Sequence, residues 1–487
     1  MENCACVYAC PDNRRVLDIF NEISAIPRGS GNEKAIADYV EAFGKRFGYF
    51  TSRDDWHNVI VRRPAAPGYE DVPALVLQGH MDMVCEANSG TVHDFLKDPI
   101  RVIEDGDIIH ADGTTLGADN GIAVAIMMAL LEKEDLQAPM LECIFTSDEE
   151  TGMSGMENLD TSCIIGRQMI NLDSAGEGEA TVACAGGVRS VLTLPVKREK
   201  LTDGETVWKL SVSGLAGGHS GEDIHRNRKM ATLTASKICG ILRDKCGIRL
   251  ISLDGGNKEN AISRECTALF AASVSSEVLQ KEVDAVVSVL HKSLVEEDKE
   301  LFVSLSAADT DFAPMTEKDS DVVLALVHLI PAGVQAMSLH IPGLVETSAN
   351  VGIITTYEDK LTVNVFVRSL NEEGVDEMES LLRYCASLSG ADLALHNRYP
   401  GWAFRDSSVM QDLYKKKWME LFGTKPKIAG IHAGLECGLF MKKIPDMDII
   451  SIGPDIRNLH SPDEMMTISS LDKLLCLLFA MLADKNL

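Results

Sequence analysis

Positive charge is scarce in this sequence of 487 residues. The chain has 46 lysines and arginines against 73 aspartates and glutamates, which gives a formal net charge of −27. Because nucleic acids and anionic membrane surfaces repel such a chain, we expect no nucleic acid and no membrane as a partner. The acidic residues are spread along the whole sequence, which is typical of a solvated surface.

Long hydrophobic runs are also missing. The two longest, residues 122–131 and 474–483, have ten residues each, whereas a helix needs about 20 to cross a bilayer. The first residues, MENCACVYACPDNRR, have neither the basic start nor the apolar core of a secretory signal. The thirteen cysteines are an odd number without a CxxC pair, which favours reduced thiols over disulfides. These features predict a cytoplasmic protein.

Several catalytic signatures are absent. The sequence contains no HExxH zinc motif and no GxxxxGK[ST] phosphate loop. The segments around Ser154 and Ser220 both lack the last glycine of the GxSxG elbow, which weighs against a serine hydrolase. Residues 176–178, GEG, lack the third glycine of a dinucleotide-binding loop and carry an acid where pyrophosphate would lie.

What the sequence does contain is a series of apolar runs that end in polar clusters. Residues 75–79 run into His80-Met81-Asp82, and the later clusters are GADNG at 117–121, SDEETG at 147–152, NLD at 171–173 and a histidine at 460. In open α/β sheets, the carboxyl ends of the strands carry the chemistry. One aspartate after a strand is more often a helix cap than a ligand. The clusters together, however, predict one metal site assembled from distant segments.

The acidic cluster at residues 148–150 is the most specific of these signals. Asp148, Glu149 and Glu150 would repel one another strongly at a buried strand end unless cations neutralised them. A solvated loop is the alternative interpretation.

The length of the chain exceeds the roughly 250 to 300 residues at which single cores stop growing, so we expect two domains. Up to residue 186, strands alternate with helices, which predicts an α/β fold with a mostly parallel central sheet. Residues 187–399 instead show alternating strand patterns with interspersed helices, which indicates an inserted α+β, ferredoxin-like domain. The first domain is therefore expected to comprise residues 1–186 and 400–487.

These motifs resemble those of the co-catalytic metallo-aminoacylase and carboxypeptidase superfamily, and within it the bacterial aminoacyl-histidine (Xaa-His) dipeptidases, the carnosine-hydrolysing type. Three longer segments carry the resemblance to this subgroup: GLAGGHSGEDIHRNR at 214–228, GGNKENAISR at 255–264 and IHAGLECG at 431–438. The resemblance implies a zinc-peptidase-like catalytic domain with an inserted lid, and hydrolysis of Xaa-His and related dipeptides. It also implies two divalent metal ions, zinc by first choice and manganese or cobalt as alternatives.

The same resemblance assigns roles to individual residues. His80 and Asp173 would hold one ion, Glu150 and His460 the other, and Asp119 would bridge both. Glu149 would act as the general base on a water held by the metals, while Asp82 would orient the His80 imidazole.

Candidates in the insert follow from the resemblance as well. His219, among glycines, is expected to stabilise the transition state, although a loop histidine in a tight turn is the alternative. Asn260 would contact the backbone or the oxyanion, and Arg368 would bind the substrate carboxylate, or else be a solvated arginine at a strand end. Closure of the insert is expected to bring His219 over the metals. The resemblance also implies a possible homodimer, because members of the family often dimerise through this domain, but the insert is long enough for two ferredoxin-like units within one chain.

Two other functions stay open at this point. An aminoacylase or another amidohydrolase acting on N-acyl amino acids would use the same metal chemistry. A metal-binding scaffold without turnover belongs to a different class, although none of the expected ligands, base or orienting residues is missing from the sequence.

Overall fold

The computed structural model describes residues 13–486, which form two compact units. The first unit comprises the chain up to Ala183, Phe404–Gly430 and the chain from Leu435 onward, and the second comprises Cys184–Ala403 with Ile431–Gly434. The segment on which the absence of a secretory signal was inferred lies mostly outside the described residues. The functional division into a catalytic domain and a lid stays a prediction.

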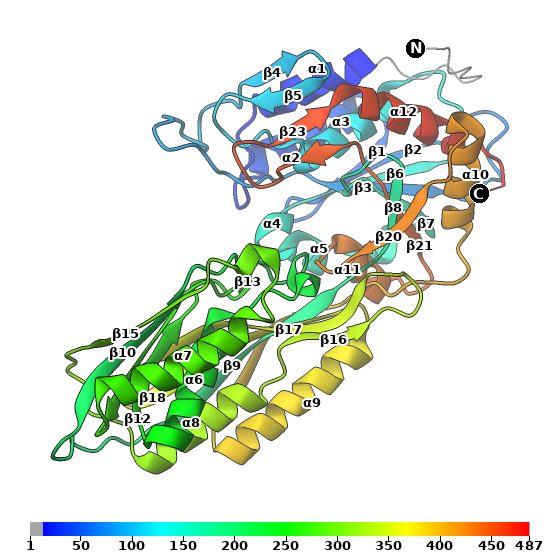
Figure 1. The fold of residues 1–487 in the computed structure, drawn as a ribbon. Coiled ribbons are helices and arrows are strands. Elements are labelled where there is room, and N and C mark those ends of the chain that lie inside the picture. The colour runs from blue at the N-terminus through cyan, green and yellow to red at the C-terminus, as the bar shows by residue number, and fades with distance from the viewer. Residues whose placement is uncertain (1–12, 487) are drawn as a thin grey trace. The chain divides into compact units, whose positions relative to one another are not determined.

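The first unit is built on an eight-stranded sheet with the order β1-β2-β6-β3-β7-β21-β8-β20 (Figure 1). Its central strands β6, β3, β7 and β21 run parallel, whereas β1, β2 and β8 pair antiparallel. The expected parallel sheet is confirmed at the centre, and the sheet as a whole is mixed. The strands are β1 (Phe50–Arg53), β2 (Val59–Arg63), β3 (Leu75–His80), β6 (Leu141–Thr146), β7 (Gln168–Asn171), β8 (Glu179–Cys184), β20 (Lys427–Ile431) and β21 (Asp448–Ser451).

Helices cover this sheet with their apolar sides. The apolar run at 122–131 lies in α3 (Ala118–Glu132), which is buried along nearly its whole length and packs against β3 and α1. The run at 474–483 lies in α12 (Ile468–Leu482), which packs against α10. None of the described helices combines the length and the apolar character that a bilayer-spanning helix needs. The remaining helices are α1 (Asn13–Ser24), α2 (Lys34–Arg46), α4 (Glu149–Gly152), α5 (Ser154–Asn158), α10 (Val409–Phe422) and α11 (Glu436–Lys443).

A small sheet was not predicted from the sequence. It has the order β22-β23-β5-β4 and joins residues far apart in the chain. Its strands are β4 (Val102–Asp105), β5 (Ile108–Ala111), β22 (Ile456–Arg457) and β23 (Met465–Thr467). At two to four residues each, these strands are too short to show a period-2 pattern in the sequence.

The second unit contains the ferredoxin-like fold twice. Its nine-stranded antiparallel sheet has the order β15-β10-β14-β12-β17-β18-β9-β19, with β16 paired to β17. The strands β10, β12, β14 and β15, with helices α6 and α7, form one βαββαβ motif. The strands β9, β17, β18 and β19, with α8 and α9, form the other. In each motif the fourth strand lies beside the first, and the third lies between the first and the second.

The strands of this unit are β9 (Gly186–Pro195), β10 (Thr206–Ser213), β12 (Arg249–Gly255), β14 (Cys266–Ala272), β15 (Phe302–Ala307), β16 (Gly333–Met337), β17 (Val345–Thr356), β18 (Lys360–Ser369) and β19 (Asp392–Tyr399), and its helices are α6 (Ala231–Cys246), α7 (Ser276–His291), α8 (Glu317–Leu329) and α9 (Glu372–Ser389). A two-stranded sheet joins β11 (Gly218–His219) to β13 (Ala261–Ile262).

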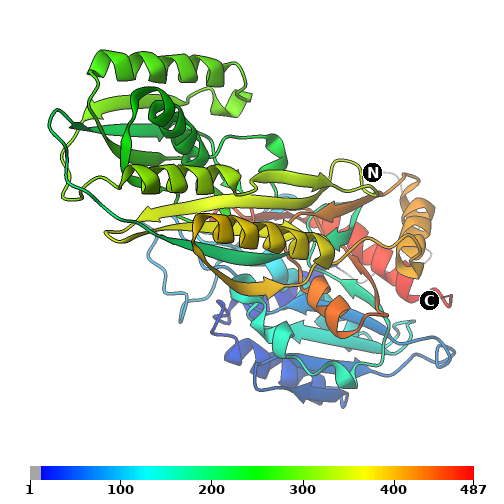
Figure 2. The ribbon, with the colours of Figure 1, turned by 90° about the horizontal axis from the view of Figure 1, so that it is seen from below.

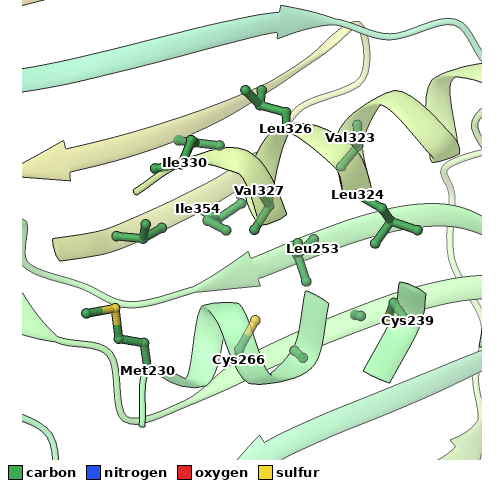
Figure 3. Packing of buried hydrophobic residues seen from close by; sticks show 14 of the residues in the cluster. Met230, Cys239, Leu253, Cys266, Val323, Leu324, Leu326, Val327, Ile330 and Ile354 are labelled. Atoms are coloured by element: carbon green, nitrogen blue, oxygen red, sulfur yellow. The ribbon is translucent and has the colours of Figure 1, made fainter. Parts of the chain in front are cut away.

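Helices α6 to α9 lie on one side of the nine-stranded sheet (Figures 1 and 2). The buried side chains of α6 and α8 meet those of β12, β14 and β17 in a continuous apolar core (Figure 3). The labelled members include Met230, Leu253, Cys266, Val327 and Ile354. This core explains why the strand patterns in this region alternate, because only one face of the sheet is covered by helices.

Two elements of this unit differ from what the sequence indicates. The sequence pattern at residues 278–296 is typical of one continuous helix, but α7 ends at His291, and a separate short 3-10 turn follows at Glu296–Asp298. Helix α8, which Thr316 caps by accepting the backbone N–H of Asp319, was not predicted.

Candidate active site

The predicted site residues of the first unit meet at one edge of the parallel sheet. His80 is the last residue of β3, Glu149 and Glu150 begin α4 directly after β6, and Asp173 follows β7. Because β6, β3 and β7 are adjacent and parallel, their carboxyl ends lie side by side. Asp119 reaches the same place from the first turn of α3.

Asp119 lies between two pairs of predicted ligands. Its Oδ1 is 3.1 Å from His80 Nε2, and its Oδ2 is 3.3 Å from His460 Nε2. His80 Nε2 also lies 3.4 Å from Asp173 Oδ1, and His460 Nε2 lies 3.1 Å from Glu150 Oε2. One carboxylate therefore faces two histidines, each of which has a second carboxylate beside it.

These residues fit a divalent cation. Ligand atoms of His80, Asp119 and Glu150 all lie within 4.8 Å of one another. Glu150 Oε1 is buried without a hydrogen-bond partner, and such an atom is costly to bury unless something binds it. Imidazole and carboxylate are the ligand types that zinc, manganese and cobalt accept.

The carboxylates of the site favour positive charge on the neighbouring histidines. Hydrogen bonds to Asp119 and Glu150 raise the pKa of His460 to about 11. Burial lowers the pKa of His80, but Asp173, Asp119 and Asp82 outweigh burial and raise it well above its usual value. Bound cations would reduce the repulsion among these carboxylates in the same way as protonated histidines do.

Two carboxyl groups at the site resist ionisation. Burial, with the neighbouring Asp119 and Glu150, raises the pKa of Asp173 to about 7 against the opposing effect of His80. Burial, with Asp173 and Glu150, raises the pKa of Glu149 well above its usual value. A carboxylate with a raised pKa accepts a proton readily, as a general base must.

Asp82 contacts more than the histidine it was predicted to orient. Its Oδ1 lies 3.4 Å from His80 Nδ1, and its backbone carbonyl lies 3.2 Å from the same nitrogen. It also accepts the backbone N–H groups of Glu149 at 3.1 Å and of Glu150 at 3.2 Å. Ser30 Oγ donates a further bond to it at 2.8 Å.

The predicted residues of the second unit include two neighbours. Arg368 Nη2 lies 3.3 Å from His219 Nε2. His219 Nδ1 accepts the backbone N–H of Glu222, so the neutral ring carries its proton on Nε2. Arg368 is buried on β18, with its guanidinium 4.2 Å from the centre of the Phe366 ring and its Nε without a hydrogen-bond partner. It is therefore not the solvated arginine of the alternative interpretation.

Asn260 occupies a different kind of position. Its backbone carbonyl accepts the N–H of Ser220 at 2.9 Å, next to His219, while its side chain is exposed.

Glu436 is a buried acid that the sequence interpretation left without a role. Its Oε2 accepts bonds of 2.6 Å from both Gln78 Nε2 and Thr146 Oγ1. Its Oε1 is buried without a partner, and burial raises its pKa to about 8. Gln78 Oε1 in turn accepts from Asn171, which continues this buried network to β7. The only signal in the sequence was its place in the IHAGLECG segment.

Comparison with known proteins agrees with this geometry. Residues 76–484 match the model of peptidase family M20/M25/M40. The cytosol non-specific dipeptidase of Escherichia coli (strain K12) is 38% identical over 468 residues, which is 96% of each chain.

Solved structures show the same similarity. The aminoacylhistidine dipeptidase from Vibrio alginolyticus has a TM-score of 0.89 at 35% identity and covers 97% of both chains. Aminopeptidase PepT from Bacillus cereus, at 16% identity and a TM-score of 0.56 over 98% of this chain and 99% of its own, shares the fold. The chain belongs to peptidase family M20/M25/M40, whose members hydrolyse peptide bonds with divalent metal ions.

Proposed function

We propose that this chain is a dipeptidase for Xaa-His and related dipeptides, including carnosine-like ones, with Glu149 as its general base. The observation that carries the proposal is the placement of Asp119 between His80 and His460, with Glu149 beside this group. The names of the E. coli and Vibrio relatives support the substrate class.

In this proposal, His80 and Asp173 would hold one divalent ion and Glu150 and His460 would hold the other, with Asp119 as a ligand available to both. We propose zinc for both positions, with manganese or cobalt as alternatives, because two imidazoles and three carboxylates suit these ions. Bound there, the ions supply Lewis acidity, which polarises the scissile carbonyl and lowers the pKa of the attacking water.

The residues around these ligands divide the remaining work. Glu149 takes a proton from the attacking water and passes it to the leaving amine. Asp82 fixes the start of α4 through the N–H groups of Glu149 and Glu150, so that one glutamate binds metal while its neighbour stays free for proton transfer. The raised pKa of Glu149 supports this division.

We assign the recognition of anionic substrate groups to the insert, residues 187–399. His219 Nε2–H and the Arg368 guanidinium are two donors 3.3 Å apart. Both could donate to oxygens with negative charge: the developing oxyanion for His219 and the substrate carboxylate for Arg368. Asn260, beside the His219 loop, is proposed to contact the peptide backbone.

A cytoplasmic location and a homodimer complete the proposal. The E. coli relative, a cytosol dipeptidase, supports the location. The two ferredoxin-like motifs in one chain allow a monomer as the alternative state, and analytical ultracentrifugation of the purified protein distinguishes the two.

The test is amine release from a panel of Xaa-His dipeptides and a matched panel of N-acyl amino acids. We expect turnover of the dipeptides, loss of turnover after chelation, and recovery with about two equivalents of metal per chain. Turnover of N-acyl amino acids alone would favour an aminoacylase. Turnover of neither panel by metal-loaded protein would favour a scaffold.

A further inference from the structure

A buried carboxylate that none of the proposed steps uses binds the backbone next to Asp119. Glu464 is 2% exposed, and its Oε2 accepts the N–H groups of Leu116 at 2.8 Å and Gly117 at 2.9 Å. Its Oε1 accepts the N–H of Asp119 itself at 3.1 Å. Three backbone donors therefore converge on one carboxylate at the start of α3, where a negative charge is also favoured by the helix dipole.

Arg28 binds the same segment through its carbonyl groups. It is 2% exposed and donates to Gly117 O at 2.6 Å and to Met81 O at 3.0 Å. A Cβ atom on Gly117 or on Gly121 would lie 2.6 or 2.4 Å from Arg28 Nη2. The two glycines of the GADNG segment thus leave room for the guanidinium, which connects this segment to the end of β3.

Glu464 also belongs to the loop that carries His460. The two residues are four positions apart, and the loop folds on itself through bonds from Glu464 N to Ser461 O at 3.0 Å and from Ser461 Oγ to Asn458 O at 2.8 Å. The carboxylate therefore connects two segments that are about 340 residues apart in sequence, one with Asp119 and the other with His460.

We infer that Glu464 is a positioning residue for the metal site, which holds Asp119 at the separation from His460 that lets one carboxylate serve both ions. The inference rests on the metal site of the proposed function. Glu464 acts through the backbone N–H of Asp119 and through its own loop. Its three hydrogen bonds are all to backbone N–H groups, and none is to the side chain of Asp119 or His460.

A purely structural role is the competing explanation, since a carboxylate at a helix start stabilises the helix wherever it occurs. The two roles differ in what they affect. Loss of a cap lowers the stability of the metal-free protein, whereas loss of a positioning residue lowers metal affinity more than loss of an equally buried carboxylate elsewhere does.

Glu464→Gln removes the charge and one acceptor at nearly constant shape. One amide oxygen cannot accept all three N–H groups, and the amide NH2 would face a backbone donor. Glu142→Gln is the matched control: Glu142 is fully buried in β6, and its Oε2 accepts the N–H groups of Ile165 at 2.8 Å and Gly166 at 2.6 Å, away from the site.

The experiment measures the dissociation constants of Zn²⁺ and Mn²⁺ by competition with a chromophoric chelator, together with the Tm of the metal-free proteins. We expect Glu464→Gln to weaken metal binding about 10- to 100-fold, and to weaken both binding events because Asp119 faces both histidines. Asp173→Asn, which removes a carboxylate beside His80 alone, should mainly weaken one event. Glu142→Gln should lower Tm with less than about a twofold change in affinity.

Unchanged metal affinity in Glu464→Gln, or a loss no larger than in Glu142→Gln, would overturn the inference. If Glu464→Gln does not fold, Glu464→Asp decides in its place, because the shorter side chain keeps the charge but cannot reach all three donors. Wild-type protein that binds neither metal would instead overturn the proposed function, so the two failures are distinguishable.

Discussion

The carboxylate of Asp82 accepts the backbone N–H of Glu149 at 3.1 Å. A residue expected only to orient a histidine thus also fixes the start of the helix that carries the proposed general base. Since Asp82 is fully buried, each of its bonds is formed without competition from water.

Asp82→Asn tests this double role. The amide NH2 of asparagine would face one of the two backbone N–H groups, so we expect α4 to shift and kcat to fall about 10- to 100-fold. Steady-state kinetics and metal analysis measure the effect. Asp54→Asn is a suitable control, because Asp54 accepts the N–H groups of Trp56 and Asn58 in a turn outside the site. Equal losses in both variants would argue against a specific role for Asp82.

Glu149→Ala should separate proton transfer from metal binding. Removal of a general base typically lowers the rate about 10²- to 10⁴-fold, while the proposed ligands all remain. We expect a metal content like that of the wild type, by elemental analysis, together with nearly abolished hydrolysis. Glu157→Ala, at an exposed position of α5, should leave both unchanged. Unimpaired hydrolysis by Glu149→Ala would show that another group is the base.

Glu436 predicts a pH dependence of stability in the metal-free protein. Burial raises the pKa of Glu436 from 4.5 to about 8, so the folded state binds the extra proton between these values. The free energy of unfolding should therefore fall as the pH rises through this range, because ionisation becomes costly in the folded state only.

Urea unfolding of the wild type and of Glu436→Gln between pH 5 and 8 measures this effect. The neutral amide cannot ionise, so the stability of the variant relative to the wild type should increase with pH. Glu157→Gln should show a constant difference. A difference for Glu436→Gln that does not depend on pH would contradict the prediction.

Gly121→Ala should destabilise the protein although alanine favours helices. The new Cβ would lie 2.4 Å from Arg28 Nη2 and would displace a buried guanidinium from its carbonyl partners, at a cost of about 2 to 4 kcal/mol. Gly152→Ala is the control, since a Cβ at that position would have nothing within 4 Å. We expect it to be neutral or slightly stabilising by urea unfolding. Equal stability of the two variants would show that the Arg28 contact is readily rearranged.

Local patterns in the sequence predicted most of what lies along a single element. The apolar run before His80 predicted a buried strand, and the structure has β3 there with every residue buried. The alternating pattern expected within residues 187–399 includes β10, whose buried residues Val207, Leu210 and Val212 are separated by half-buried or exposed ones. Such elements are predictable because burial of one face or of both faces leaves a periodic or continuous apolar pattern.

The pattern of the second unit predicted ferredoxin-like structure but not how it is arranged. In the sequence, the first motif, β10 to β15, is inserted between β9 and α8 of the second motif. Strands that pair in the second motif are therefore far apart in the sequence, and their pairing is seen only in the tertiary structure. Helix α8 was missed because its first turn, EKDS, is polar and resembles a loop.

By itself, the sequence determined which side chains are available for metal chemistry: each follows an apolar run, and the acids at 148–150 cannot remain close together in a buried place without positive charge. Only the tertiary structure decided that Asp119 faces both His80 and His460, and that Arg28, Glu436 and Glu464 bind the segments that carry the ligands. The physical reason is that these contacts join residues tens to hundreds of positions apart in the sequence. The periodicity of a sequence reports on local secondary structure, and it does not indicate which distant backbone group a buried charge binds.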